Sequence, residues 1–95
     1  MAVKIIILRR VNKEQEEAMR PLLLKMRSMA MTQPGYISGE TLINFDDPEE
    51  HLVISTWKTL DDWNKWLESP ARGDLQHKVD EALGRETLYQ IYYNG

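Results

Sequence analysis

The sequence predicts one α+β domain whose elements follow the order strand, helix, strand, strand, helix pair, strand. Three observations carry this prediction. An apolar β-branched run and an aromatic-rich run lie near the two ends of the chain, and two regions between them have the 3.6-residue period of amphipathic helices. A charged turn at 46–50 joins two strand-like segments. With right-handed crossovers, this order gives a ferredoxin-like antiparallel sheet with the helices on one face.

The first strand is expected at Val3–Arg10, where four consecutive apolar residues indicate a strand covered on both faces. Asn12 has the position of a helix N-cap, and Gln15 completes a capping box three residues later. Pro21 interrupts the helix that follows, so this helix is expected either to bend there or to begin there. Its predicted buried stripe consists of Met19, Leu22, Leu23, Met26 and Ala30.

The segment Gln33-Pro34-Gly35 ends that helix and turns the chain. Polar and apolar residues then alternate over Tyr36–Phe45, which predicts a second strand, and Gly39 within it suggests a bulge. His51–Trp57 has the composition of a third strand. Because the connection is short, the second and third strands are expected to form a hairpin.

Thr59 is expected to cap a second helix. Pro70 breaks that helix and can open a further one, which Gly84 closes in a left-handed conformation. The last strand is expected at Glu86–Tyr93. The predicted inward face of the second helix consists of Trp63, Trp66 and Leu67.

Length and composition restrict the classes of function. The 95 residues suffice for a single domain, taken as residues 1–95. The net charge is −3 and the twelve basic residues are dispersed, so no binding of nucleic acid is expected, and no basic amphipathic helix suggests a membrane surface. The absence of cysteine suits a reducing compartment, and the longest early apolar run, Ile5–Leu8, is too short for a signal or a span. The protein is therefore expected in the cytoplasm.

The first strand is apolar on both sides, although the predicted helices can cover only one face of the sheet. An uncovered apolar face needs a partner, and a second copy of the same sheet is the simplest one. A chain this short also has a marginal core of its own. The sequence therefore predicts a two-fold homodimer that forms through the sheet.

Three segments together resemble the antibiotic biosynthesis monooxygenase family of dimeric α+β barrels. They are QPGY at Gln33–Tyr36, the passage STWKTLDDWNKWLESP at Ser55–Pro70, and the aromatic final strand. The resemblance covers nearly the whole chain. It implies a fold that hosts cofactor-free oxygenases of quinols and polyphenols, relatives that degrade haem, and many members without an assigned substrate.

The resemblance to the haem-degrading relatives is incomplete at the residues that would hold haem. Trp66 falls where those relatives place a tryptophan against the porphyrin. Their iron-binding histidine corresponds to Gln76 here, and the nearest histidine is His77. Adjacent residues of a helix point about 100° apart, so His77 is expected to point in a different direction from the iron ligand. Their first-strand asparagine corresponds to Ile7. Haem is therefore not expected, and no cofactor is predicted.

Five residues are candidates for a site that binds a small aromatic molecule. His77 can act as a general base for a phenolic proton if it lines a pocket; otherwise it is a solvent-facing histidine late in an acidic helix. Trp66 either fills the core or stacks on a flat substrate. Polar anchors are expected from strand residues that otherwise lie at strand ends in water, namely Arg9, Tyr36 and Asn44. The second histidine, His51, is expected to be structural or exposed.

Two functions of different classes remain open. The first is a cofactor-independent monooxygenase for a small aromatic or quinol-like substrate. The second is a dimer without enzymatic activity that binds or senses a small hydrophobic ligand in the same cavity. The sequence contains no zinc-ligand spacing, no glycine-rich phosphate loop and no dinucleotide fingerprint. A titratable side chain that points into the cavity would distinguish the first function from the second.

Overall fold

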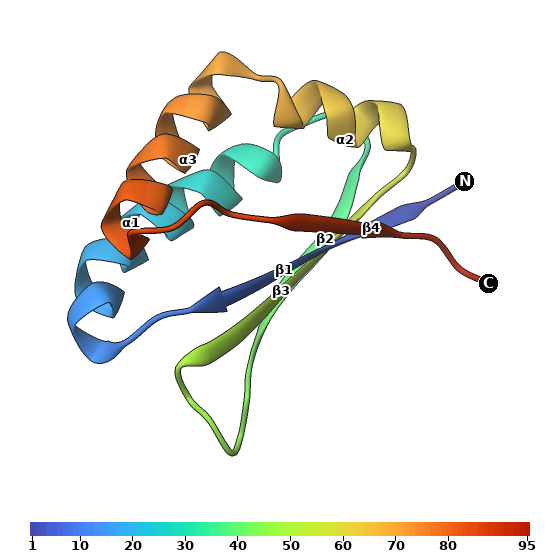
Figure 1. Cartoon of the computed structure of the whole chain (residues 1–95). Helices are drawn as coiled ribbons and strands as arrows, with labels where there is room; N and C mark the ends of the chain where they lie inside the picture. Colours follow the sequence, from blue (N-terminus) through green and yellow to red (C-terminus); the bar gives the residue numbers. More distant parts are fainter.

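Four antiparallel strands form one sheet in the order β2-β3-β1-β4, and three helices lie on one side of it (Figure 1). The computed structural model describes all residues from 1 to 95. This arrangement confirms the predicted ferredoxin-like fold. The elements are β1 (Val3–Arg10), α1 (Lys13–Ala30), β2 (Tyr36–Ile43), β3 (Glu50–Trp57), α2 (Leu60–Leu67), α3 (Pro70–Leu83) and β4 (Tyr89–Tyr92).

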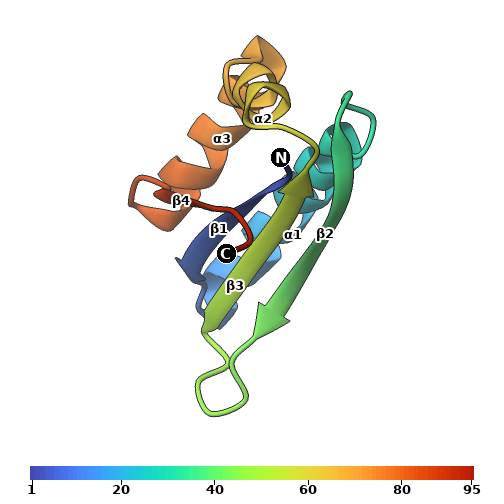
Figure 2. The ribbon, with the colours of Figure 1, turned by 90° about the vertical axis from the view of Figure 1, so that its right-hand side faces the viewer.

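The central strand β1 alternates strictly between the two faces of the sheet. Its inward residues are buried beneath the helices, whereas Leu8 on the other face remains 62% exposed. The expectation that both faces of this strand are covered is therefore wrong for the single chain, because the helices form only one layer (Figure 2). The inward residues of β1 are Val3, Ile5, Ile7 and Arg9.

The helix α1 begins at the predicted capping box. The Gln15 amide donates to the Asn12 side chain at 2.8 Å, and the Asn12 amide donates to the Gln15 side chain at 3.2 Å. The helix then continues through Pro21 to Ala30, so it does not begin at the proline. Pro21 is exposed, which lets water satisfy the carbonyl group that the missing N–H leaves free.

The β2–β3 hairpin differs from the prediction in the position of its bulge. The register steps between Tyr36 and Ser38, so the extra residue is Ile37 rather than Gly39. Gly39 instead allows the Tyr36 hydroxyl to lie close to the backbone of β2, since a Cβ atom at position 39 would be 2.6 Å from that hydroxyl. β2 ends at Ile43, two residues early, because the side chain of Asn44 accepts from the amides of the following turn.

The two short helices follow their predicted signals. Thr59 caps α2 by accepting from the amide of Asp62 at 3.1 Å, and α3 begins at Pro70. Gly84 closes α3 with a φ angle of 70°. β4 is shorter than the expected Glu86–Tyr93, since only four residues pair with β1. None of the three helices is both long enough and apolar enough to cross a membrane.

The core is divided into two clusters. The first joins the beginning of β1 and the end of β3 to α2, and consists of Val3, Ile5, Trp57, Trp63 and Trp66. The second joins α1 to α3, and consists of Val11, Met19, Val79 and Leu83. Met26 on α1 packs against both. Between these clusters, α1 and the sheet leave room for a cavity.

Candidate functional site

A cavity of about 260 Å³ lies between α1 and the helix-facing side of β1, β2 and β3. One wall comes from α1, where Met19, Leu23 and Met26 are apolar. The charged residues Glu16, Arg20 and Arg27 of the same helix also line the cavity. The opposite wall is the sheet, where inward residues of three strands meet. Aromatic side chains close one end of the cavity; they are Tyr36, Trp57, Trp63 and Trp66.

The aromatic end is held rigid by edge-to-face contacts. Tyr36 and Trp57 meet with ring centroids 5.4 Å apart at 87°, and Trp57 meets Trp63 at 5.8 Å and 62°. The Trp57 indole N–H donates to the Ser55 hydroxyl at 3.1 Å. Trp66 is 4% exposed and lines the same cavity. This position is compatible with the second role predicted for it, stacking on a flat substrate. Rings fixed in this way offer flat faces to an aromatic guest.

Arg9 is the last inward residue of β1 and lines the cavity. It is 7% exposed, forms no ion pair, and its Nε atom has no hydrogen-bond partner. Burial lowers the pKa of Arg9, an effect that Tyr89 and Asp80 partly oppose. The structure therefore places a buried guanidinium with free donors beside the cavity.

His51 lies directly opposite Arg9 in the β1–β3 ladder and also lines the cavity. Its Nε2 atom is 3.2 Å from the carbonyl oxygen of Pro48. A hydrogen bond to this carbonyl oxygen, which only accepts, requires the ring proton on Nε2, and in that tautomer Nδ1 carries a lone pair. The sequence predicts a structural or exposed role for this residue. His51 and Trp57 are an even number of residues apart on β3. Because successive side chains of a strand alternate between its two faces, both residues lie on the inward face.

Arg72 is a second buried arginine that the sequence reading missed. It comes from the first turn of α3, is 4% exposed and lines the cavity. Its Nη2 atom donates to the Tyr89 hydroxyl and, at 3.4 Å, to the side-chain oxygen of Gln76. The guanidinium carbon lies 5.6 Å from the ring centroid of Trp63. Its Nε atom, like that of Arg9, has no partner.

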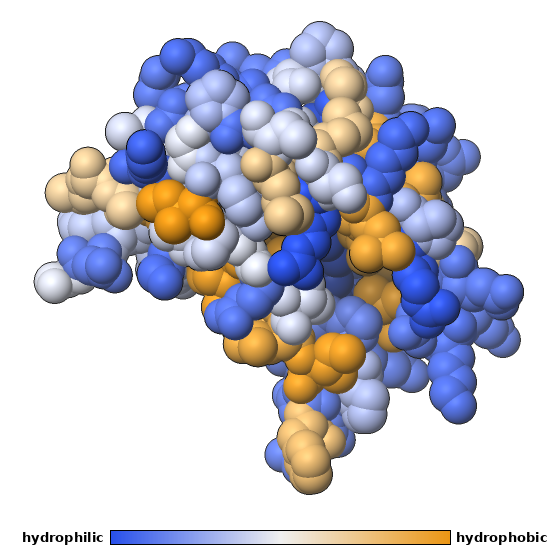
Figure 3. Space-filling view, turned by 180° about the vertical axis from the view of Figure 1, so that it is seen from behind, coloured by the Kyte–Doolittle hydropathy of each residue, from blue (hydrophilic) through white to orange (hydrophobic).

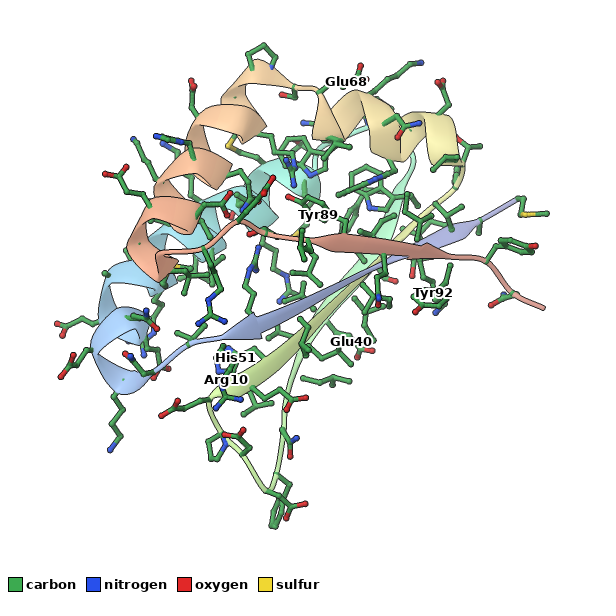
Figure 4. All side chains as sticks on the ribbon, viewed as in Figure 1. Arg10, Glu40, His51, Glu68, Tyr89 and Tyr92 are labelled. Carbon is green, nitrogen blue, oxygen red and sulfur yellow. The ribbon has the colours of Figure 1, made fainter.

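Gln76 belongs to a polar network behind the cavity. Its amide nitrogen donates to Asp80 and to Thr87, both at 2.7 Å, and its oxygen accepts from the Tyr89 hydroxyl at 2.9 Å. Figure 4 shows Tyr89 on the helix side of β4. The position that carries the iron ligand in haem-degrading relatives is therefore filled by an amide whose polar atoms are engaged.

Two of the predicted site residues lie outside the cavity. His77 has a side chain that is 81% exposed and lies 3.8 Å from Glu81, on the solvent side of α3. Its role as a base required a place in the pocket, and that condition is not met. Asn44 is exposed in the hairpin turn, where its side chain binds backbone amides. Trp66, Arg9 and Tyr36 do line the cavity.

No cluster of three or more His, Cys, Asp or Glu side chains is arranged to hold a metal.

The sequence model of the family described as antibiotic biosynthesis monooxygenase matches residues 2–78, which include every residue of the cavity. The chain belongs to this family. No curated protein is similar enough in sequence to count as a relative. The family match ends within α3, so β4 and the Tyr89 end of the polar network lie beyond it.

Solved structures share the fold of this family member over its whole length. A conserved protein from Methanosarcina mazei Go1 is 18% identical, with a TM-score of 0.90 over 100% of this chain and 94% of the other. Rv0793 from Mycobacterium tuberculosis is 18% identical, with a TM-score of 0.85 over 99% and 95%. SnoaB from Streptomyces nogalater, a cofactor-independent oxygenase, is 16% identical, with a TM-score of 0.84 over 99% and 93%. At these identities the likeness establishes the fold alone.

Proposed function

We propose that this family member is a cofactor-independent monooxygenase that acts on a small aromatic or quinol-like substrate in the cavity between α1 and the sheet. The observation that carries the proposal is that one cavity is lined by several aromatic side chains, by the imidazole of His51 and by the buried guanidinium of Arg9. Family membership and the fold shared with SnoaB, an oxygenase named as cofactor-independent, support the same reaction class.

The cavity has a size that suits one or two fused rings. A cavity of about 150 Å³ lined by apolar side chains holds a benzene ring, and drug-sized ligands occupy roughly 300–1,000 Å³. The volume of about 260 Å³ lies between these values. Trp66 and Trp57 line the end where a flat ring would stack. A small aromatic substrate is therefore the class of molecule that fits.

We assign the role of general base to His51 instead of His77. The Nδ1 atom of His51 has a free lone pair, whereas Nε2 is held by Pro48. A neutral imidazole near neutral pH accepts a phenolic proton readily. Arg9, directly across the ladder, then stabilises the negative charge that the substrate oxygen acquires. Tyr36 is positioned to hydrogen-bond an oxygen of the substrate from the same wall.

The reaction balances without an external reductant. A quinol and O₂ give a hydroxyquinone and water: one oxygen atom replaces a ring hydrogen, and the other leaves as water with two hydrogens of the quinol. The quinol supplies all four electrons. Proton removal makes the ring electron-rich, so that it can pass electrons to O₂ directly. The protein needs only to bind the substrate, remove the proton and stabilise the anion.

Oxygen uptake tests this proposal. The purified chain, treated to remove metals and flavins, is offered a panel of mono- and bicyclic quinols in an oxygen electrode, and products are identified by mass spectrometry. We expect protein-dependent uptake and a product heavier by the net gain of one oxygen and loss of two hydrogens. Calorimetric binding of the panel without any uptake would contradict the enzymatic function and support the dimer that only binds or senses a ligand.

We also propose that the chain forms a homodimer through the open face of its sheet. This face carries an apolar group made of Ile6, Leu8, Leu42, Leu52, Ile54 and Tyr92. Figure 3 shows hydrophobic side chains gathered along the molecule toward the hairpin tip, and Figure 4 shows Tyr92 and Glu40 on the side of the sheet away from the helices. A second copy would cover this face, and a specific interface of this kind buries more than about 1,000 Å².

A further inference from the structure

We propose that the cavity contains an anion-binding subsite, formed by Arg9, Arg72 and Trp63, that holds the carboxylate of an aromatic acid. The inference deepens the proposed function and rests on it for the location of the substrate. It goes further because it names a charged group that the substrate must carry. The subsite can be tested by binding alone, without turnover.

The first observation concerns hydrogen bonds that the chain does not make. Three buried side-chain nitrogen atoms have no partner, and they are Arg9 Nε, Arg72 Nε and Trp63 Nε1. All three residues are more than nine-tenths buried, and all three line the same cavity. Buried donors in folded proteins are nearly always satisfied, so a group of unsatisfied donors around one cavity points to a missing acceptor.

The second observation concerns charge. Arg9 and Arg72 are the only charged residues that are more than nine-tenths buried, and no carboxylate is buried to that extent. Asp80 is the nearby acid, but it already accepts from Gln76 and from Thr87. Two buried cations therefore line the cavity, and no buried carboxylate accompanies them; the other charged residues of its lining, Glu16, Arg20, Arg27 and Glu40, are exposed. A buried charge is costly unless it is paired, so an anionic ligand would supply what the fold lacks.

The third observation concerns the shape of the donors. The guanidinium of Arg9 has an Nε atom without a partner, and a carboxylate can bind such a planar group through two parallel hydrogen bonds. The two oxygens of a carboxylate can accept about four hydrogen bonds, so a carboxylate has acceptor capacity beyond a single guanidinium. A phenolate offers a single oxygen. Since Trp63 also belongs to the aromatic end of the cavity, the carboxylate is attached to an aromatic ring.

The test compares an aromatic acid with its neutral counterpart. We choose 2-naphthoate and 2-naphthamide, which have the same ring and nearly the same shape but differ in charge, and titrate each into the full chain by calorimetry. Neither compound is a quinol, so neither can undergo the proposed oxidation. We expect 2-naphthoate to bind about 10- to 100-fold more tightly than the amide. Equal affinity, or binding of neither compound, would overturn the subsite.

Variants assign the preference to the subsite. Arg9→Met should weaken binding of 2-naphthoate by about 10- to 100-fold and leave binding of 2-naphthamide nearly unchanged. Arg9→Lys keeps the charge but loses the fork, and should give an intermediate affinity for the acid. The matched control is Arg10→Met, because Arg10 is the next residue, lies on the other face of β1 and pairs with Asp47. A preference for the acid that survives in Arg9→Met would overturn the assignment.

A second assay separates failure of the subsite from failure of the proposed function. Oxygen uptake is compared for 2,5-dihydroxybenzoate and 2,5-dihydroxybenzamide, two quinols that differ in the same way. Tight binding of 2-naphthoate with no uptake of oxygen by any quinol supports the subsite and removes the oxygenase. Uptake at equal kcat/KM for the acid and the amide supports the oxygenase and removes the subsite.

Discussion

Arg9 and His51 are direct partners in the β1–β3 ladder, and both side chains face the cavity beneath α1. Side chains opposite each other on one face of an antiparallel pair have Cβ atoms about 4.5–5.5 Å apart. An imidazole and a guanidinium are thus held side by side by the backbone hydrogen bonds of the ladder.

Replacing His51 tests the assignment of the base. Because proton removal by a positioned base typically contributes about 10²–10⁴ in rate, His51→Ala should lower kcat for quinol oxidation by that factor. The matched control is His77→Ala, since His77 is exposed on α3 and far from the lining of the cavity. Oxygen-electrode kinetics provide the measurement. Equal rates for His51→Ala and the unmodified protein would remove His51 from the mechanism.

Trp66→Phe tests the stacking wall. The smaller ring keeps an aromatic face but loses contact area, so we expect KM to rise by about 2- to 10-fold while kcat stays within twofold. The control is Tyr93→Phe, because Tyr93 is 65% exposed and lies outside the cavity. A fall in kcat with unchanged KM would show that Trp66 acts on the chemical step instead of on binding.

The buried guanidinium of Arg9 should lower the free energy of unfolding of the ligand-free protein. An unpaired buried guanidinium is unfavourable, so Arg9→Met should raise the stability of the free protein by about 1–4 kcal/mol. For a domain of this size, each kcal/mol corresponds to about 4–8 °C in Tm. Thermal unfolding at one fixed protein concentration gives the answer. Arg10→Met, which breaks an exposed ion pair, should change little. A lower Tm for Arg9→Met would assign Arg9 a structural role.

Haem should not bind through a histidine of α3. The iron-ligand position holds Gln76, whose amide is engaged with Asp80 and Thr87, and His77 points into solvent. We therefore expect haemin to produce no sharp, saturable shift of the Soret band in a titration. The prediction fails if such a shift occurs and disappears in His77→Ala.

The proposed dimer can be disrupted without damage to the single chain. Leu8 is 62% exposed on the open sheet face, so Leu8→Glu should leave the fold intact while placing a charge in the interface. Light scattering should find a dimer for the unmodified protein and the 11.2 kDa monomer for the variant. Leu88→Glu is the control, because Leu88 is 74% exposed and lies outside the strands. A monomeric unmodified protein at micromolar concentration would contradict the dimer.

Much of the fold was readable from the sequence because its signals are local. The capping box at Asn12, the cap at Thr59 and the left-handed Gly84 each depend on residues within one helical turn, and all three occur in the structure. The bulge was misplaced for the same reason. Gly39 looked like a bulge from its neighbours alone, but it is required by the ring of Tyr36, and the extra residue is Ile37.

The candidate site was only partly readable. Trp66, Arg9 and Tyr36 line the cavity, because each falls on the inward face of its helix or strand. The sequence predicts a base at His77 only if that residue lines a pocket, and a structural or exposed role for His51, whereas in the structure His77 is exposed and His51 lines the cavity. One residue of helix, about 100° of rotation, separates the inward Gln76 from the outward His77. The phase of β3, counted from Trp57, places His51 inward.

By itself, the sequence determined the order of the elements, their caps and the class of fold, since these follow from periodicity and from contacts within a few residues. Only the tertiary structure decided the chemistry of the cavity. Arg9 on β1, His51 on β3 and Arg72 on α3 are distant in the chain, and they meet because the sheet register and the seating of α3 bring their elements together. Which donors remain without a partner is a property of that assembled packing, and no local pattern encodes it.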